Sequence, residues 1–233
     1  MSGSHGVTFP NESADYRAAR HKLLDAEARL REQTEEVACL RRELPLGGVV
    51  KSDYVFEEGG RNLADNQTTK LVRLSELFQD EKDSLIIYSF MYGPAMNAPC
   101  PMCTSLLDGL NGNALHIRQR VNFAVVAESP LKRIRPFARE RGWGNLRLLS
   151  SASNTYTADY HGQTPDGAQM PMLNVFTRRG GQIHHFYGTE LLYAPFPEGM
   201  DARHVDSVWP LWNMLDFTPE GRGTVWYPEL RYG

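Results

Sequence analysis

Apolar and small residues recur every three or four positions between residues 13 and 44, and charged residues separate them. The positions on this stripe are Tyr16, Ala19, Leu23, Ala26, Leu30, Val37 and Leu40, with Gln33 among them. Because an α-helix turns every 3.6 residues, this spacing puts the stripe on one face and predicts a long amphipathic helix. The stripe could lie across the rest of the molecule or pair with a second copy in a homodimer, and the sequence leaves both open.

Pro45 and Gly48 end this helix, and short runs with other spacings follow it. Extended or buried strands are expected at residues 49–57, 85–91, 121–127 and 146–149. Helical spacing is seen at residues 71–78, 100–117 and 131–141, with an interruption expected at Gly112. Strands and helices therefore alternate through the middle of the chain.

The last third of the chain predicts a hairpin and a terminal helix. Residues 173–176 and 182–187 flank the glycines at 180–181, which readily adopt the positive φ of a tight turn, so an antiparallel hairpin is expected. Residues 202–215 show helical spacing, and Pro210 predicts a kink or break there.

The predicted order is strand, helix, strand, helix, short strand, hairpin and terminal helix. Parallel strands need crossover helices and a hairpin adds antiparallel strands, so the sheet is mixed. This is the order of a thioredoxin-like α/β fold, a central mixed β-sheet flanked by helices. We expect two parts: residues 1–48, with a disordered start and the long helix, and residues 49–233, the thioredoxin-like domain.

Composition narrows the class of protein. The chain has 233 residues, 41% hydrophobic and 23% charged, which is typical of a folded protein in water. A formal net charge of -3 offers no broad basic field for phosphates, so no nucleic-acid partner is expected. We also expect no membrane partner, because no apolar run approaches the roughly 18–20 residues that span a bilayer. The N-terminus lacks the pattern of a secretion signal, which predicts a cytoplasmic protein.

Two of the three cysteines form the motif Cys100-Pro101-Met102-Cys103 where a helix is expected to begin. Thiols three positions apart in the first turn face the same side, close enough for a disulfide. Backbone N–H groups at a helix start stabilise a thiolate, so Cys100 is the expected nucleophile. Cys103 is expected to resolve the mixed disulfide. The motif predicts exchange with protein or small-molecule thiols and disulfides, without a cofactor.

Four further residues are expected to shape a substrate groove beside the thiols. Pro101 suits the first helical turn, and Met102 is a soft side chain that leaves the sulfurs approachable. Met170 and Pro171 precede the strand expected at 173–176. Thioredoxin folds carry a cis proline at this place, facing the cysteine pair. We therefore expect the Met170–Pro171 bond to be cis, although only about 5–6% of X-Pro bonds are.

A metal site is the main chemical alternative, because a CxxC pair is also half of a typical zinc site. Further ligands are few. Cys39 lies in the predicted long helix, where a small buried apolar role is expected. His184 and His185 are neighbours on a strand and point to opposite faces, although either could join the thiols in a copper site. The favoured prediction is that no metal is bound.

Two other groups of residues receive structural interpretations. The basic residues of the helix at 131–141, namely Lys132, Arg133, Arg135, Arg139 and Arg141, are expected to form a solvated face. The C-terminal tryptophans Trp209, Trp212 and Trp226 are expected in the core.

Several short segments together resemble a known family. They are Tyr16-Arg17-Ala18-Ala19-Arg20, Tyr54-Val55-Phe56, Phe90-Met91-Tyr92-Gly93-Pro94, Gly142-Trp143, Ser150-Ser151 and Leu215-Asp216-Phe217-Thr218-Pro219-Glu220-Gly221-Arg222. This set resembles the thioredoxin-like bacterial family catalogued as domain of unknown function 899, whose members are described as predicted dithiol-disulfide oxidoreductases. The resemblance covers nearly the whole chain and implies a thioredoxin-like fold and a redox role.

Two departures from related families bear on mechanism. Thioredoxins carry a buried acidic proton acceptor in the strand before the cysteines, and residues 85–91 contain no acidic residue. Peroxiredoxins place a threonine three positions before the reactive cysteine, where Asn97 stands here, so a dedicated peroxidase is not expected. Three functions stay open: a dithiol-disulfide oxidoreductase, which we favour, a copper or zinc module, and a redox-inert interaction protein.

Overall fold

The computed structural model describes residues 6–65, 67–195, 198, 207–221, 223 and 225–231. Its contacts divide the chain into two units, Met1–Pro45 and Leu46–Gly233. Each unit is described by itself. In the described part of the chain, no helix combines the length and the apolar character needed to cross a membrane.

The first unit is built around α1 (Ala14–Arg42), which confirms the predicted long helix. Ser13 caps its start by accepting a hydrogen bond from the Tyr16 N–H at 3.1 Å. None of its residues is buried, and Leu30 on the apolar stripe is 63% exposed. Cys39 is exposed as well, so its expected burial is wrong. The reason is that α1 alone forms no core into which a thiol could pack.

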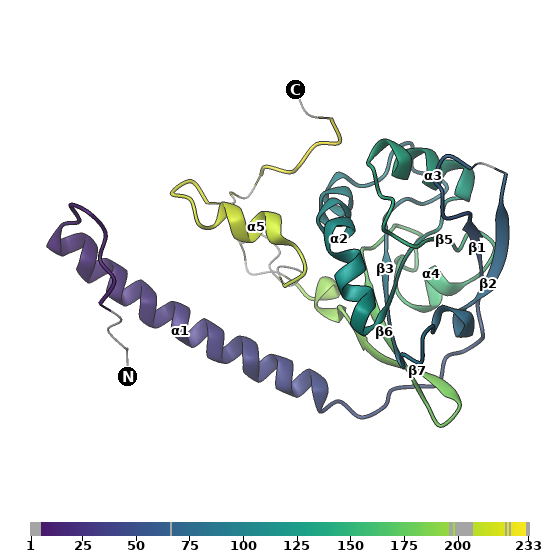
Figure 1. Ribbon diagram of the computed structural model, residues 1–233, viewed down its shortest axis with the longest axis horizontal. Helices are drawn as coiled ribbons and strands as arrows, with labels where there is room; N and C mark the ends of the chain where they lie inside the picture. The colour runs from purple at the N-terminus through teal and green to yellow at the C-terminus, as the bar shows by residue number, and fades with distance from the viewer. Residues whose placement is uncertain are drawn as a thin grey trace. The chain divides into compact units, whose positions relative to one another are not determined.

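The second unit holds a seven-stranded sheet in the order β2-β1-β5-β4-β3-β6-β7, most of whose strands are labelled in Figure 1. The strands are β1 (Val55–Gly59), β2 (Thr69–Arg73), β3 (Ser84–Ser89), β4 (Asn122–Ala127), β5 (Leu148–Ser150), β6 (Leu173–Arg179) and β7 (Gln182–Gly188). The α-helices are α2 (Pro101–Arg120), α3 (Leu131–Glu140), α4 (Tyr156–Asp159) and α5 (Pro210–Leu215), and the 3₁₀ helices are η1 (Leu74–Leu77) and η2 (Glu190–Tyr193).

Strand directions establish the fold class. β4 runs parallel to both β3 and β5, and the helices α2 and α3 make the two crossovers between these strands. β6 then pairs antiparallel with β3, and β7 antiparallel with β6. A strand that leads into a helix beginning at the CxxC motif, followed by a parallel strand and a returning hairpin, is a thioredoxin-like arrangement. The chain therefore has the predicted α/β fold with a mixed sheet.

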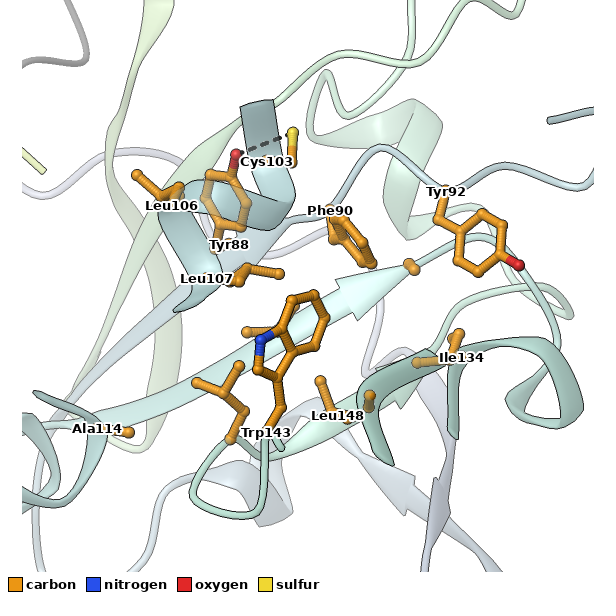
Figure 2. Packing of buried hydrophobic residues seen from close by; sticks show 14 of the residues in the cluster. Tyr88, Phe90, Tyr92, Cys103, Leu106, Leu107, Ala114, Ile134, Trp143 and Leu148 are labelled. Atoms are coloured by element: carbon orange, nitrogen blue, oxygen red, sulfur yellow. Dashed lines mark hydrogen bonds between the residues drawn. The ribbon is translucent and has the colours of Figure 1, made fainter. Parts of the chain in front are cut away.

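Both faces of the sheet are buried, because alternate residues of the central strands enter different cores. Tyr88 and Phe90 pack with α2, α3 and α5 on one face, around Trp143, which is fully buried (Figure 2). Leu85 and Ile87 pack on the other face, with η1 and α4. Because both faces of β3 are buried, its sequence is continuously apolar. This burial also holds β3 in place, and the chain leads from its end to Cys100.

Several boundaries differ from the sequence expectations. Leu71 belongs to β2 rather than to a helix: it is 71% exposed while Val72 beside it is 4% exposed, the alternation of a strand. α2 continues through Gly112, because one glycine costs a helix only about 1 kcal/mol and the buried face of α2 outweighs that. Pro210 begins α5 instead of kinking it. Residues 202–206 of the expected helix lie outside the described residues.

Residues 47–50 run along the outer edge of β7. Val50 N–H donates to the Ile183 carbonyl and His185 N–H donates to the Gly48 carbonyl, both at 3.0 Å. A Cβ at Gly47 would lie 2.3 Å from the His185 carbonyl oxygen, so this close approach needs glycine. The segment that follows α1 is thereby fastened to the edge of the sheet. Because residues 47–50 contact the edge of β7, only the last part of the extended run expected at 49–57 belongs to β1, which begins at Val55.

Candidate functional site

The two cysteines lie where β3 ends and α2 begins, on the same side of the sheet as Tyr88. Cys100 is the N-cap of α2, and its backbone N–H donates to the Met91 carbonyl at 3.0 Å. Cys100 is half-buried, whereas Cys103 is 1% exposed and belongs to the core of Figure 2. The outer sulfur is therefore the one that a substrate can reach, and the inner sulfur lies beneath it.

The surroundings of Cys100 favour its thiolate. A hydrogen bond from the Cys103 side chain is the largest influence and lowers its pKa, burial opposes this, and the N–H groups of Cys103 and Met102 lower it further. The resulting pKa is about 7, below the ordinary value of 9.0. Near pH 7 about half of the Cys100 side chains are therefore ionised, a population large enough for nucleophilic attack.

The pKa of Cys103 is shifted in the opposite direction to that of Cys100. Burial raises its pKa well above the ordinary value, and the hydrogen bond to Cys100 and the Cys100 charge raise it further. Hydrogen bonds from Tyr88 and from the Met91 N–H lower it, without reversing the direction. Near neutral pH the pair therefore holds one or two protons, and where it holds one, the thiolate is the outer sulfur and the thiol the inner one. Loss of the negative charge on Cys100 removes one cause of the raised pKa.

Tyr88 is the functional candidate that the sequence did not reveal. Its hydroxyl donates to the Cys103 sulfur at 3.2 Å, as the dashed line in Figure 2 marks. Burial raises the Tyr88 pKa well above its ordinary value, so the hydroxyl stays protonated and acts as a donor. It touches the inner thiol, where thioredoxins were expected to place an acid. The sequence feature that could have indicated this role is the two-residue spacing of Tyr88 and Phe90, which puts both rings on the face of the sheet that α2 covers.

A small apolar cavity adjoins the inner cysteine and has a volume of about 130 Å³. It brings Pro171 and Met102 together with Cys103, and Tyr88, Leu173 and Trp209 also line it. Met170 and Pro101, the other two expected groove residues, are not among its lining residues. Met170 is instead held by its N–H, which donates to the Gly162 carbonyl at 2.8 Å. Pro101 occupies the first position of α2, as expected.

Pro171 differs from the expectation in its peptide bond. No peptide bond between described residues is cis, so the Met170–Pro171 bond is trans and the predicted cis proline is wrong. The trans form is the lower-energy one for an X-Pro bond by roughly 0.5–1 kcal/mol. The hydrogen bonds on either side, from Met170 N–H to Gly162 and from Ser89 N–H to Met172, are made with the bond in this form.

Arg133 fixes the loop that precedes Cys100. Its guanidinium donates to the carbonyls of Gly93 at 3.2 Å and Pro94 at 3.1 Å, and also to that of Met96. The same group lies 4.5 Å from the centre of the Tyr92 ring. A solvated basic face was expected here, and for Arg133 that is wrong because the loop supplies carbonyl acceptors within reach of its guanidinium. Arg135 is likewise buried, and Arg141 pairs with Asp108.

The structure gives no support to a metal site at the thiols. The described residues contain no group of three or more histidine, cysteine, aspartate or glutamate side chains arranged to hold a metal ion. His184 Nδ1 lies 3.0 Å from the Gly47 carbonyl, and His185 Nε2 lies 2.8 Å from Asn174 Oδ1. Both rings are thus engaged in the β7 region, apart from the residues that surround Cys103.

Several solved structures are similar to this chain. A reduced 2-Cys peroxiredoxin from Plasmodium vivax is 13% identical with a TM-score of 0.45, over 73% of this chain and 98% of that one. A peroxiredoxin Q mutant from Xanthomonas campestris is 12% identical with a TM-score of 0.46, over 72% and 96%. The peroxidoxin BcpB from Mycobacterium tuberculosis is 20% identical with a TM-score of 0.40, over 72% and 96%.

Sequence comparison identifies the family of this chain. No functionally curated protein matches this chain. The family described as bacterial protein of unknown function, DUF899, matches residues 7–232 and so spans α1, the sheet and the dithiol loop together. This chain belongs to the DUF899 family of bacterial proteins, and it carries the thioredoxin-like fold that the resemblance implied.

Proposed function

We propose that this protein is a dithiol-disulfide oxidoreductase that acts through Cys100 and Cys103. The observation that carries the proposal is the contrast between the two sulfurs. Cys100 is half-buried with a pKa of about 7, whereas Cys103 is buried with a raised pKa and a hydrogen bond from Tyr88. An ionised outer sulfur and a protonated inner sulfur suit a nucleophile and a resolving thiol.

The exchange reduces a substrate disulfide in two steps. The Cys100 thiolate attacks one sulfur of the substrate disulfide, the substrate S–S bond breaks, and the departing thiolate takes a proton from water. Cys103 then loses its proton and attacks Cys100 Sγ, which releases the second substrate sulfur as a thiolate. Two electrons pass to the substrate and a Cys100–Cys103 disulfide remains. The reverse sequence oxidises a dithiol.

Tyr88 has a role in the second step of this proposal. Once Cys100 is joined to the substrate it carries no charge, so one cause of the high Cys103 pKa is gone. The hydrogen bond from the Tyr88 hydroxyl then stabilises the Cys103 thiolate as it forms. The proton leaves to water or to the departing sulfur, because the Tyr88 hydroxyl is itself a donor to Cys103 and has no carboxylate partner among the described residues.

The substrate is a thiol or disulfide of a protein or small molecule whose apolar part fits beside Pro171 and Met102. Both residues line the cavity next to Cys103, and nearly all other lining side chains are apolar. Met170 and Pro101 border the same approach in this proposal. We place the activity in the cytoplasm, where a dithiol is kept reduced and a structural disulfide is uncommon.

The proposal is tested by the thiol content of the full chain across glutathione redox buffers. A Cys39→Ser background isolates the pair, because Cys39 is an exposed third thiol. We expect two thiols to disappear together as the buffer becomes more oxidising and to return on reduction. Cys100→Ser and Cys103→Ser in the same background should each lose the two-thiol step. A Cys39→Ser protein that keeps both thiols throughout would contradict the proposal.

We also propose that α1 joins two copies of the chain as a parallel homodimer. The exposed stripe repeats every seven residues: one row holds Tyr16, Leu23, Leu30 and Val37, and the other holds Ala19, Ala26, Gln33 and Leu40. These rows are the a and d positions of four heptads, the pattern of a coiled coil. None of these side chains is buried within the described chain, so a partner helix can cover them.

Charges beside the stripe favour a second copy in the parallel orientation. In a parallel pair each g position faces the e position of the next heptad on the partner. The facing pairs are Asp15 with Arg20, Lys22 with Glu27, Arg29 with Thr34, and Glu36 with Arg41. Three of these pairs are oppositely charged and none is repulsive. An antiparallel pair of the same stripes brings Arg29 and Glu27 each against its own copy, which is unfavourable.

A further inference from the structure

We infer that a second cavity, separate from the dithiol, binds a small organic anion with two or more negative charges. It has a volume of about 420 Å³, which is within the usual range for small-molecule sites. Its walls come from the end of β1, the second half of α2, the middle of α3 and the segment that enters β5. Its charged lining residues are Glu58, Arg61, Lys70, Arg118, Arg135 and Arg147.

The charge of these walls is strongly one-sided. Five basic side chains line the cavity against a single carboxylate, that of Glu58, although the whole chain has a net charge of -3. Glu58 accepts two hydrogen bonds from Arg147, at 2.8 and 2.9 Å, and pairs with Lys70 at 3.3 Å. Arg147 and Lys70 therefore neutralise the charge of Glu58, and the remaining three arginines make the cavity positive.

Those three arginines have no carboxylate within ion-pair distance in the part of the chain that the structure describes. They are Arg61, Arg118 and Arg135. Two acids from neighbouring loops have other hydrogen-bond or ion-pair partners: Asp65 accepts from the N–H groups of Gln67 and Thr68, and Asp80 pairs with Lys82. Hydrogen bonds from Thr68 and Gln67 lower the pKa of Asp65, and the Arg135 charge lowers it further without forming an ion pair. Arginines that gather at a concave surface without acidic partners repel one another, and a bound anion removes that repulsion.

Arg135 is a buried and firmly held part of the cavity wall. It is 6% exposed, and it donates to the carbonyls of Gly60, Asn62 and Asp65 at 2.9, 2.6 and 2.7 Å. Its Nε is buried and has no hydrogen-bond acceptor among the described residues. A Cβ at Gly59 would lie 2.2 Å from its Nη1, so glycine at this position leaves room for the guanidinium. The three carbonyls are uncharged, so they hold the Arg135 guanidinium in place without neutralising it, and Arg135 contributes a fixed positive charge to the cavity wall.

The remaining walls define the rest of the ligand. Leu115 and Leu146 offer apolar surface, and Asn145 and Thr68 offer hydrogen bonds. The ligand is therefore a phosphate monoester or a polycarboxylate with a small apolar part. The concave form and limited volume suit such a molecule better than a polymer. Arg118 lies about 22 Å along α2 from Cys103, at about 1.5 Å per residue, so the site does not overlap the thiols.

Calorimetric titration of the full chain with three probes at constant ionic strength tests the inference. Phenyl phosphate combines a dianion with an apolar part, citrate is a polycarboxylate, and inorganic phosphate lacks the apolar part. We expect saturable binding, at one site per chain, of phenyl phosphate or citrate more tightly than of inorganic phosphate. Whichever binds more tightly identifies the headgroup.

Variants of exposed arginines assign that binding to the cavity. Arg118→Gln and Arg61→Gln should each weaken it about tenfold or more, since each removes a charge-assisted hydrogen bond to the anion. Arg120→Gln is the matched control, because Arg120 is exposed on the same helix but does not line the cavity. Absence of saturable binding by all three probes, or an equal loss in the Arg120→Gln protein, would overturn the inference.

Discussion

At the residue scale, the two cysteines are three positions apart but differ greatly in protonation. Hydrogen bonds from the Cys103 side chain and from N–H groups at the start of α2 lower the pKa of the half-buried Cys100. Burial and the neighbouring Cys100 raise the pKa of Cys103 by more than the hydrogen bonds from Tyr88 and Met91 lower it. The proposed order of reaction rests on this difference, because only the outer sulfur is both ionised and reachable near neutral pH. Two predictions concern these sulfurs.

The first prediction is the pH dependence of Cys100 alkylation. Because its pKa is lowered to about 7, the thiolate grows as the pH rises through 7 and is nearly complete two units above it. In the reduced Cys39→Ser protein, the rate of iodoacetamide reaction should rise with a midpoint near pH 7 and then level off. Mass spectrometry should find the label on Cys100. A midpoint near pH 9, the ordinary value, would show that the helix start does not stabilise the thiolate.

The second prediction concerns Tyr88→Phe. This change removes the hydroxyl that donates to Cys103 and should raise the Cys103 pKa further. A hydrogen bond of about 1 kcal/mol corresponds to about fivefold in rate, so closure of the Cys100–Cys103 disulfide from a mixed disulfide should slow by about that factor. Stopped-flow release of a chromogenic thiol measures this step.

The control for this prediction is Tyr156→Phe, which also removes a buried hydroxyl but lies in the core on the other face of the sheet. The initial attack by Cys100 should be little changed in both variants. Equal slowing of closure by the two variants would assign the effect to general loss of packing and not to the contact with Cys103.

At the scale of single elements, α1 carries a pattern that its own unit does not bury. Four heptads of apolar and small residues give a seam about 40 Å long, at about 1.5 Å per residue. Polar Gln33 within this seam can fix the register of two helices, because its amide finds a partner only opposite its own copy. The proposed dimer therefore has one alignment.

The prediction for this element is that Leu30→Asp converts a dimer into a monomer. A charge at an a position enters the apolar seam of both copies, where it lacks a partner. Ala28→Asp adds the same charge to the outer side of α1 and should leave the dimer intact. Light scattering coupled to size-exclusion chromatography measures the mass. A wild-type monomer at all concentrations would contradict the proposal.

Orientation is tested separately with Gln33→Cys in the Cys39→Ser background. Parallel copies in register bring the two new thiols together, and mild oxidation should yield a crosslinked dimer on a denaturing gel. An antiparallel pair keeps them in different layers and gives no crosslink. Under that outcome the helix still pairs, but the charge argument for orientation is wrong.

The helix α3 shows where sequence patterns mislead. Basic residues spaced along a helix usually face solvent, and the side chains of Arg133, Arg135 and Arg141 do not. Each reaches past its helix to groups from distant segments: the loop before Cys100, the loop after β1, and Asp108 on α2. The long arginine side chain makes such contacts possible, and the partners are up to 89 positions away in sequence, as is the Leu230 carbonyl that accepts from Arg141. Spacing along one helix cannot reveal them.

At the scale of the whole molecule, much of the architecture can be predicted from the sequence. The strands β3 and β4 were predicted because burial on both faces makes them continuously apolar, and α2 because its cysteines and leucines share one face. β2 was missed because it is short and mostly exposed, with Val72 as its one buried residue. Trp209 and Trp212 are core residues as expected, whereas Trp226 is 50% exposed.

The candidate site was predicted less completely than the fold. The CxxC motif is local, so its position at the start of α2 follows from the sequence. Pro171 joins Cys103 at the same cavity, as its place in the order of elements implied, although its peptide bond is trans. Tyr88 and Arg133 could not be assigned roles, since a tyrosine hydroxyl in an apolar strand and an arginine on a helix acquire partners only when the chain folds.

The strip formed by residues 47–50 has a mechanical consequence. Any pull exerted through α1 reaches the sheet by way of this strip, which two backbone hydrogen bonds hold to the edge of β7. Tension would break those few contacts before it disturbed the doubly buried central strands, and it would lengthen the tether by only a few residues. The hydrogen bonds of residues 47–50 would then be the first to break under tension, and β3, the strand that leads to the thiols, would keep its structure.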